Sequence, residues 1–260
     1  MIDLAFSMYD LEYFLLILVR VVGFIAVAPF YGMTNTPARV KIGLSVFVSI
    51  LLYYTLTPAS AVEYSTVYGY AAIVLKEAVT GLILGFVVNI CNSIVNFAGS
   101  IIDMEVGFSM VTLMDPATKE FSSVSGIFYQ YMVMLLLVVT GMYQYILKAF
   151  VESYTLIPIN GAILSSDTLL ASMIKFMGDS IILGFRICLP VFSVMLILNA
   201  VLGVLAKVSP QLNMFAVGLQ LKVLVGLAVM FFTASMLPGA ADFIFTEMKT
   251  MMVSVVEGMM

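Results

Sequence analysis

Six long apolar segments, separated by short breaks rich in Gly, Pro and polar residues, run through almost the whole of this sequence. They cover roughly residues 13–30, 40–56, 70–102, 127–147, 181–206 and 215–237. A helix that crosses a bilayer needs about 20 mainly apolar residues, and the segments approach or exceed this length. The sequence therefore predicts an all-α integral membrane protein with about six long apolar helices.

The composition supports this class and excludes several others. Of 260 residues, 63% are hydrophobic and only 10% are charged, whereas about a quarter of a soluble domain is charged. The absence of histidine excludes a Ser-His-Asp triad and His-ligated zinc. Cys91 and Cys188 lie far apart in apolar segments, which predicts buried thiols. A net charge of −4 without a basic cluster argues against nucleic-acid binding, and we expect neither catalysis, a metal nor a cofactor.

The third segment is too long for a simple membrane crossing. As a single helix, residues 70–112 would extend roughly 65 Å, about twice the hydrocarbon thickness of a bilayer. Either the segment bends back on itself, or much of it lies outside lipid. Gly81 and Gly85 within it have the small-xxx-small spacing that permits close helix packing.

A polar seam follows one face of this third segment. Its members are three or four residues apart or adjacent in the same turn, so a helix places them on one side. Because side-chain amides are costly against lipid tails, the seam should face protein or a water-filled lumen. Helix–helix hydrogen bonding and a pore-facing or subunit-facing role remain equally open. The seam consists of Asn89, Asn92, Ser93, Asn96, Ser100 and Asp103.

Ionisable residues also occur within the apolar segments, where a charge is expensive unless it is paired or lines a cavity. They are Arg20, Asp103, Glu105, Arg186 and Lys222. Asp103 and Glu105 are two residues apart, so a regular helix points them to different sides. We therefore expect ion pairing, with Arg186, Lys222 or another subunit, in preference to a proton relay.

A Pro-containing turn between Gly107 and Gly126 has apolar residues on both sides. One interpretation is an ordinary helix end. The other is a hydrophobic plug, since apolar constrictions resist ion passage by dewetting. The residues expected to form such a seal are Phe108, Met110, Met114, Asp115, Pro116 and Phe121.

The C-terminal tail predicts an amphipathic helix. Ile244, Met248, Met251, Val255 and Met259 form its apolar stripe at helical spacing. This stripe could bind a membrane surface or a partner's groove, or pack on the chain's own helices.

Four stretches together resemble the FliR family of the flagellar type III protein-export gate. Residues 18–43 contain APF followed by PARVKIG, and residues 98–116 read AGSIIDMEVGFSMVTLMDP. Residues 140–158 begin with TG and end with LIP, and residues 208–226 contain PQLNMFAVGLQLK. The stretches occur in the family's order and extend over most of the chain. Glu105 departs from the pattern, because Gln is usual at its position.

This resemblance implies a helical, funnel-shaped gate in which one such chain assembles with several FliP-like and FliQ-like subunits. Residues 1–170 would be the FliP-like part, and residues 171–260 the FliQ-like hairpin with the amphipathic helix. FlhB-like and FlhA-like export proteins would be further partners, and unfolded flagellar proteins the cargo. The plug loop would correspond to residues 108–121, and the location would be the inner membrane within the flagellar basal body, in contact with lipid.

The sequence thus predicts a non-catalytic pore subunit that helps unfolded flagellar proteins cross the inner membrane and seals the resting pore. One alternative is the equivalent subunit of a virulence injectisome. Another, from a different class, is a secondary transporter or ion channel. Its site would lie near the bilayer midplane and could use Asp103, Arg186 and Lys222.

Overall fold

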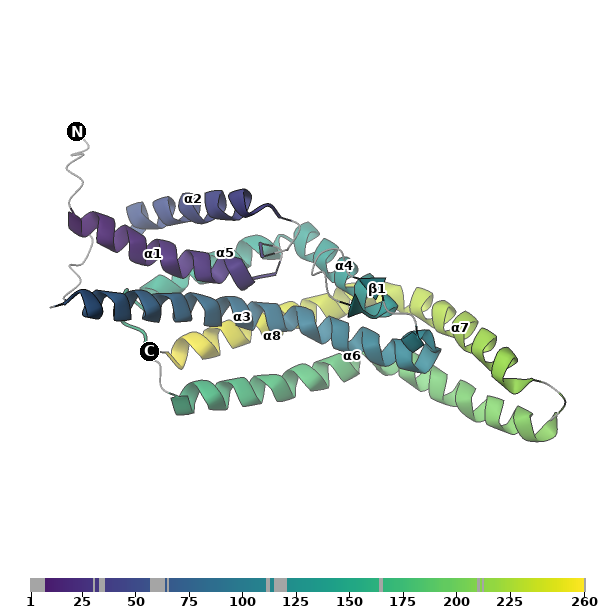
Figure 1. Ribbon diagram of the computed structural model, residues 1–260. Coiled ribbons are helices and arrows are strands. Elements are labelled where there is room, and N and C mark those ends of the chain that lie inside the picture. Colours follow the sequence, from purple (N-terminus) through teal and green to yellow (C-terminus); the bar gives the residue numbers. More distant parts are fainter. Residues whose placement is uncertain are drawn as a thin grey trace. The chain divides into compact units, whose positions relative to one another are not determined.

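The computed structural model describes residues 8–29, 31–32, 36–56, 64, 66–110, 113–114, 121–163, 166–209, 211 and 213–259. Most of them lie in eight α-helices, and the expected all-α membrane fold is confirmed (Figure 1). The helices are α1 Met8–Val27, α2 Ala38–Leu56, α3 Val67–Val106, α4 Val124–Val139, α5 Met142–Leu156, α6 Ser166–Val208, α7 Met214–Thr233 and α8 Leu237–Glu257. Shorter elements are η1 Phe108–Met110, η2 Ala234–Met236, β1 Leu113–Met114 and β2 Phe121–Ser122.

Four helical stretches among the described residues are long and apolar enough to cross a membrane. They are Ala38–Leu56, Val67–Val106, Leu170–Val208 and Ala216–Glu257, and α4 with α5 could add a fifth. The segment expected over residues 127–147 is two helices, because Gly141 interrupts it with φ of 73°. α1 does not qualify, since its 20 residues include Asp10, Glu12 and Arg20.

The chain divides into two compact units that share three helices. The first unit contains Met1–Asn89, Tyr143–Ile174 and Met248–Met260, and the second contains Ile90–Met142 and Lys175–Glu247. α3 is one 40-residue helix between Val67 and Val106, so it does not turn back on itself. The predicted division near residue 170 separates a FliP-like part from a FliQ-like hairpin. It concerns similarity to partner subunits and stays a prediction.

In the first unit, α1 and α2 form a hairpin, and α3 packs closely on α1 (Figure 1). A Cβ on Gly81 would overlap the backbone of Arg20, and one on Gly85 would lie 2.8 Å from the Phe24 carbonyl oxygen. The close approach predicted from the Gly81–Gly85 spacing is therefore confirmed. Phe24 also stacks on Phe150 of α5, with ring centroids 4.1 Å apart.

The end of α8 belongs to the first unit and packs on its own chain. Met248, Met251, Val255 and Met259 of the predicted apolar stripe are all buried. The Ile163 N–H donates to the Met259 carbonyl at 2.7 Å. Of the alternatives for this stripe, the structure shows the terminal helix packed on the chain's own helices.

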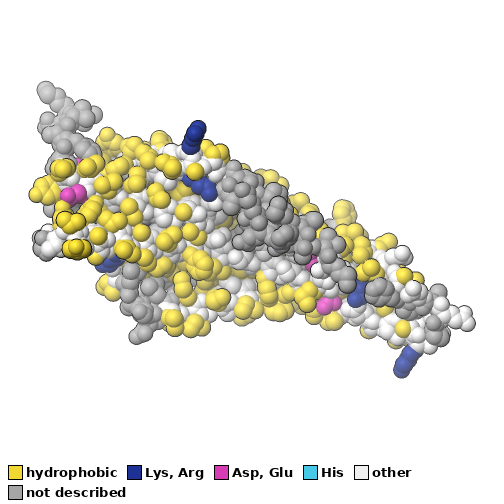
Figure 2. Space-filling view, viewed as in Figure 1, with side chains coloured by type: hydrophobic (Ala, Val, Ile, Leu, Met, Phe, Trp, Pro, Cys, Tyr) yellow, Lys and Arg dark blue, Asp and Glu magenta, His cyan; other side chains and the backbone are white. Residues whose placement is uncertain are grey.

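Large hydrophobic side chains cover much of the visible surface, and charged side chains are few and scattered (Figure 2). Phe231 and Phe232 on α7 are 77% and 74% exposed, and Ile197 on α6 is 66% exposed. Contiguous apolar surface of this kind marks contact with a membrane or with other proteins.

Candidate functional site

The residues at the end of α3 anchor the loop that leads to α4, within the second unit. Asp103, in the last turn of α3, is 2% exposed. Its carboxylate accepts hydrogen bonds from the backbone N–H of Val124 at 2.6 Å and of Ser125 at 3.1 Å. These amides belong to the first turn of α4. The carboxylate of one helix therefore holds the start of the next.

The first turn of α4 is capped from two directions. Ser123 is the N-cap, and its hydroxyl accepts the Gly126 N–H at 3.0 Å. Together with the two bonds to Asp103, this satisfies three consecutive N–H groups that have no partner inside the helix. A negative carboxylate also suits the positive end of the helix dipole. This local structure forms because the Ser123 side chain can cap a helix and the Asp103 carboxylate lies within hydrogen-bond distance of the first amides of α4.

A glycine contact brings α3 and α4 together beside this carboxylate. A Cβ at Gly99 would overlap the backbone N and Cα of Gly126, so neither helix could approach as closely with a larger residue. Gly107 ends α3 with φ of 96°, a conformation that glycine adopts without strain. The loop from Gly107 to Ser123 thus begins at the end of α3. Its other end is hydrogen-bonded, through the first turn of α4, to Asp103 in the last turn of α3.

The loop itself contains a short antiparallel ladder. Leu113 pairs with Ser122, and Met114 pairs with Phe121, so the backbones of two predicted sealing residues are brought side by side. Phe108 is half-buried in η1. The side chains of Met110, Met114 and Phe121, and all of Asp115 and Pro116, lie outside the described residues. Their predicted role in a seal remains a prediction.

The polar seam of α3 is only partly covered by the chain itself. Asn89 and Asn96 are half-buried, Ser93 and Ser100 are exposed, and Asp103 is buried. The Ser100 hydroxyl donates to the Asn96 carbonyl of its own helix at 2.9 Å. The side chain of Asn92 lies outside the described residues. Asp103 holds α4, whereas the exposed members remain available to a lumen or another subunit.

Arg20 forms a buried ion pair that the sequence analysis missed. Its Nε donates to Glu77 of α3 at 2.5 Å, and both side chains have no solvent exposure. Arg20 Nη1 donates to the Ile157 carbonyl at 2.9 Å, and its guanidinium lies 4.4 Å from the ring centroid of Tyr154. The other Glu77 oxygen accepts the Asn160 N–H at 2.8 Å. The pair thus joins α1 and α3 to the LIP turn after α5.

The remaining charges within apolar segments are not gathered into one site. The Asn199 amide donates to Glu105 at 3.3 Å. The Arg186 guanidinium lies 5.0 Å from the ring centroid of Phe243, and Lys222 is half-buried on α7. The expected pairing of Asp103 with Arg186 or Lys222 is wrong, because α4 backbone amides satisfy its carboxylate. Asp103 and Glu105 do have separate partners, as their spacing predicted.

Chemical sites of other kinds are not evident in the part of the chain that the structure describes. Among those residues, no group of three or more His, Cys, Asp and Glu is placed to hold a metal ion. Cys188 is a free, buried thiol that donates to the Phe185 carbonyl at 3.3 Å, as predicted for this residue. The side chain of Cys91 lies outside the described residues.

Long apolar helices, buried polar contacts between them and a largely hydrophobic surface define a multi-helix membrane protein. The profile of bacterial export proteins, family 1, matches residues 11–248. This chain therefore belongs to the family of bacterial export proteins, family 1.

Several proteins named flagellar biosynthetic protein FliR are similar to this chain over most of its length. The protein from Bacillus subtilis (strain 168) is 31% identical over 214 residues, which is 82% of each chain. The protein from Escherichia coli (strain K12) is 29% identical over 245 residues, 92% of this chain and 90% of the relative. The Aquifex aeolicus (strain VF5) protein is 29% identical over 81% of each chain.

Proposed function

We propose that this chain is a non-catalytic component of the flagellar protein-export apparatus, and that it serves as a subunit of the export pore. Family membership and the FliR relatives support the first statement. One structural observation carries the second: a loop with apolar residues is held at both ends by the last turns of α3. An apolar loop whose base is fixed in this way suits a plug.

The physical task of an export pore has two parts. An extended polypeptide must pass, and ions must not leak when it is absent. In this proposal Phe108, Met110, Met114 and Phe121 supply an apolar constriction, with Asp115 and Pro116 at its turn. Asp103, Gly99 and Ser123 position the base of the loop through α4.

The proposed environment is an assembly of FliP-like and FliQ-like subunits, with FlhB-like and FlhA-like proteins as neighbours. Its location would be the bacterial inner membrane within the flagellar basal body. The division into a FliP-like part and a FliQ-like hairpin belongs to this proposal. Exposed apolar surface on α6 and α7 supports it, because sister subunits would cover that surface. Exposed Ser93 and Ser100 would then face the lumen or its lining.

The test removes the tip of the loop and keeps its base. Deletion of residues 110–119 leaves Asp103, Gly107 and Ser123 in place, and should raise ion conductance through the assembled gate in planar bilayers. A matched variant replaces the same ten residues with Gly and Ser. It should also leak, because its length is preserved and its apolar character is lost. Unchanged conductance in both variants would refute the plug assignment.

Two alternative functions of this chain predict different experimental results. An injectisome subunit would support export of needle components and not of flagellar ones in a complementation assay. A transporter or ion channel would move its solute in liposomes that contain this chain alone, whereas a gate subunit requires its partners. The separate surroundings of Asp103, Arg186 and Lys222 provide no support for a transport site formed by these three residues.

A further inference from the structure

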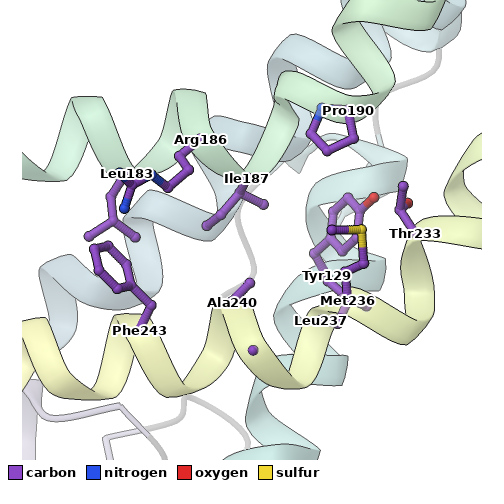
Figure 3. Close-up of a pocket in the computed structure, with 11 residues that line it drawn as sticks. Tyr129, Leu183, Arg186, Ile187, Pro190, Thr233, Met236, Leu237, Ala240 and Phe243 are labelled. Carbon is purple, nitrogen blue, oxygen red and sulfur yellow. The ribbon is translucent and has the colours of Figure 1, made fainter.

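A cavity of about 380 Å³ lies between α6 and the start of α8 in the second unit (Figure 3). Tyr129 of α4 and Thr233 at the end of α7 also line it. Met236, another lining residue, is 63% exposed, so the cavity reaches the protein surface. Its volume is within the range of small-molecule binding sites, which is roughly 300–1,000 Å³.

The polar groups of this cavity are unevenly distributed. Arg186 and Phe243 lie at one end, and Tyr129, Thr233 and Pro190 lie at the other (Figure 3). The Thr233 hydroxyl already donates to the Val229 and Met230 carbonyls of its own helix, at 2.9 and 3.2 Å. A ligand that fits must therefore carry an anionic group at the Arg186 end and be apolar along the rest.

Arg186 needs such an anion because of where it lies. It is an exposed residue within Leu170–Val208, a stretch apolar enough to cross a membrane. Phe243 provides a cation–π contact, but no carboxylate among the described residues forms an ion pair with Arg186.

The lining of the cavity indicates the kind of occupant. The residues that line it are mainly apolar, and Arg186 is the one charged side chain among the described residues of the lining. An amphiphile with a single anionic group matches this pattern. An acyl chain is narrow enough to lie along Ile187 toward Pro190, with its phosphate at the surface beside Arg186.

We propose that Arg186 and this cavity bind one anionic glycerophospholipid. The guanidinium holds the phosphate through charge-assisted hydrogen bonds, and one acyl chain fills the apolar space between α6 and α8. The bound lipid neutralises Arg186 within the membrane and fixes the spacing of the two helices. This site is separate from the loop after α3, and it does not depend on the proposed plug.

Native mass spectrometry of the full chain in mild detergent tests this site. The chain is titrated with phosphatidylglycerol and, separately, with phosphatidylcholine, both alone and in the complex that co-purifies with it. One tightly bound phosphatidylglycerol is expected. Arg186→Gln should weaken its binding about tenfold to hundredfold, the loss expected for a charged hydrogen-bond partner. Arg186→Lys should retain part of the affinity.

Two further variants separate the cavity from general surface charge. Ala240→Phe should abolish binding, because the added ring fills the apolar space. Lys207→Gln removes another exposed cation of α6 outside the cavity and should change nothing. Equal binding by wild type, Arg186→Gln and Ala240→Phe would overturn the proposal. So would a complex without bound lipid in which position 240 cross-links to a partner subunit, since partner side chains would then occupy the cavity.

Discussion

Replacement of Asp103 with Ala should release the start of α4. The carboxylate accepts two backbone N–H groups while only 2% exposed, so solvent screening does not weaken the contact appreciably. A hydrogen bond to a charged group contributes at least about 1.5 kcal/mol, so loss of both should cost about 3 kcal/mol locally. That corresponds to roughly a hundredfold change in an equilibrium constant.

Hydrogen exchange measures this local opening directly, because buried amides exchange only when their segment opens. In Asp103→Ala, the amides of Val124 and Ser125 should exchange roughly 100-fold faster than in the wild type. Asp103→Asn keeps one neutral acceptor oxygen, so its effect should be about half as large in free energy.

Ser100→Ala is the matched control. Its hydroxyl is exposed, lies one turn earlier on α3 and, among the residues that the structure describes, donates to the Asn96 carbonyl of that helix. Exchange at α4 should therefore stay at the wild-type rate. If the amides of Val124 and Ser125 exchanged as slowly in Asp103→Ala as in the wild type, the carboxylate would not hold α4. The anchored base of the loop would then be disproved.

Removal of one partner from the buried pair, as in Glu77→Leu, should lower stability in detergent by about 3–5 kcal/mol, because Arg20 stays buried without its counter-charge. The double variant with Arg20→Met should cost less than the sum of the single variants, and Lys148→Gln, at an exposed pair, should shift the melting temperature little. Gly99→Ala should destabilise the contact between α3 and α4 and lower the melting temperature. Gly178→Ala, where an added Cβ meets nothing within 4 Å, should be neutral or stabilising; equal melting for the two glycine variants would contradict the close contact.

Residue spacing was sufficient to predict local features of this fold. The Gly81–Gly85 pair indicated close packing, and α1 does lie against it. The apolar stripe at the end of α8 was visible at helical spacing, but its burial on the chain itself was one of several alternatives. Spacing reports which residues share a face, and it does not say what covers that face.

The partners of the buried charges were not predictable in this way. Lys76 and Glu77 stand in an apolar segment, which is the signal that could have suggested Glu77 as the partner of Arg20. Asp103 was expected to meet a cation, yet its partners are backbone amides, and every helical sequence contains such groups. Every residue except proline has a backbone N–H, so the pattern of side chains does not show which N–H will donate to a buried carboxylate.

The amino-acid sequence by itself determined that this chain is a helical membrane protein, because so few charges cannot make its long apolar segments soluble. It also indicated most of the breaks between helices, because Gly and Pro act on the local backbone, but not the break at Gly141 within residues 127–147. Only the tertiary structure decided that Asp103 holds the start of α4, that Arg20 meets Glu77, and that Arg186 borders a cavity. These contacts join residues that are distant along the chain, so they exist only once the helices have packed.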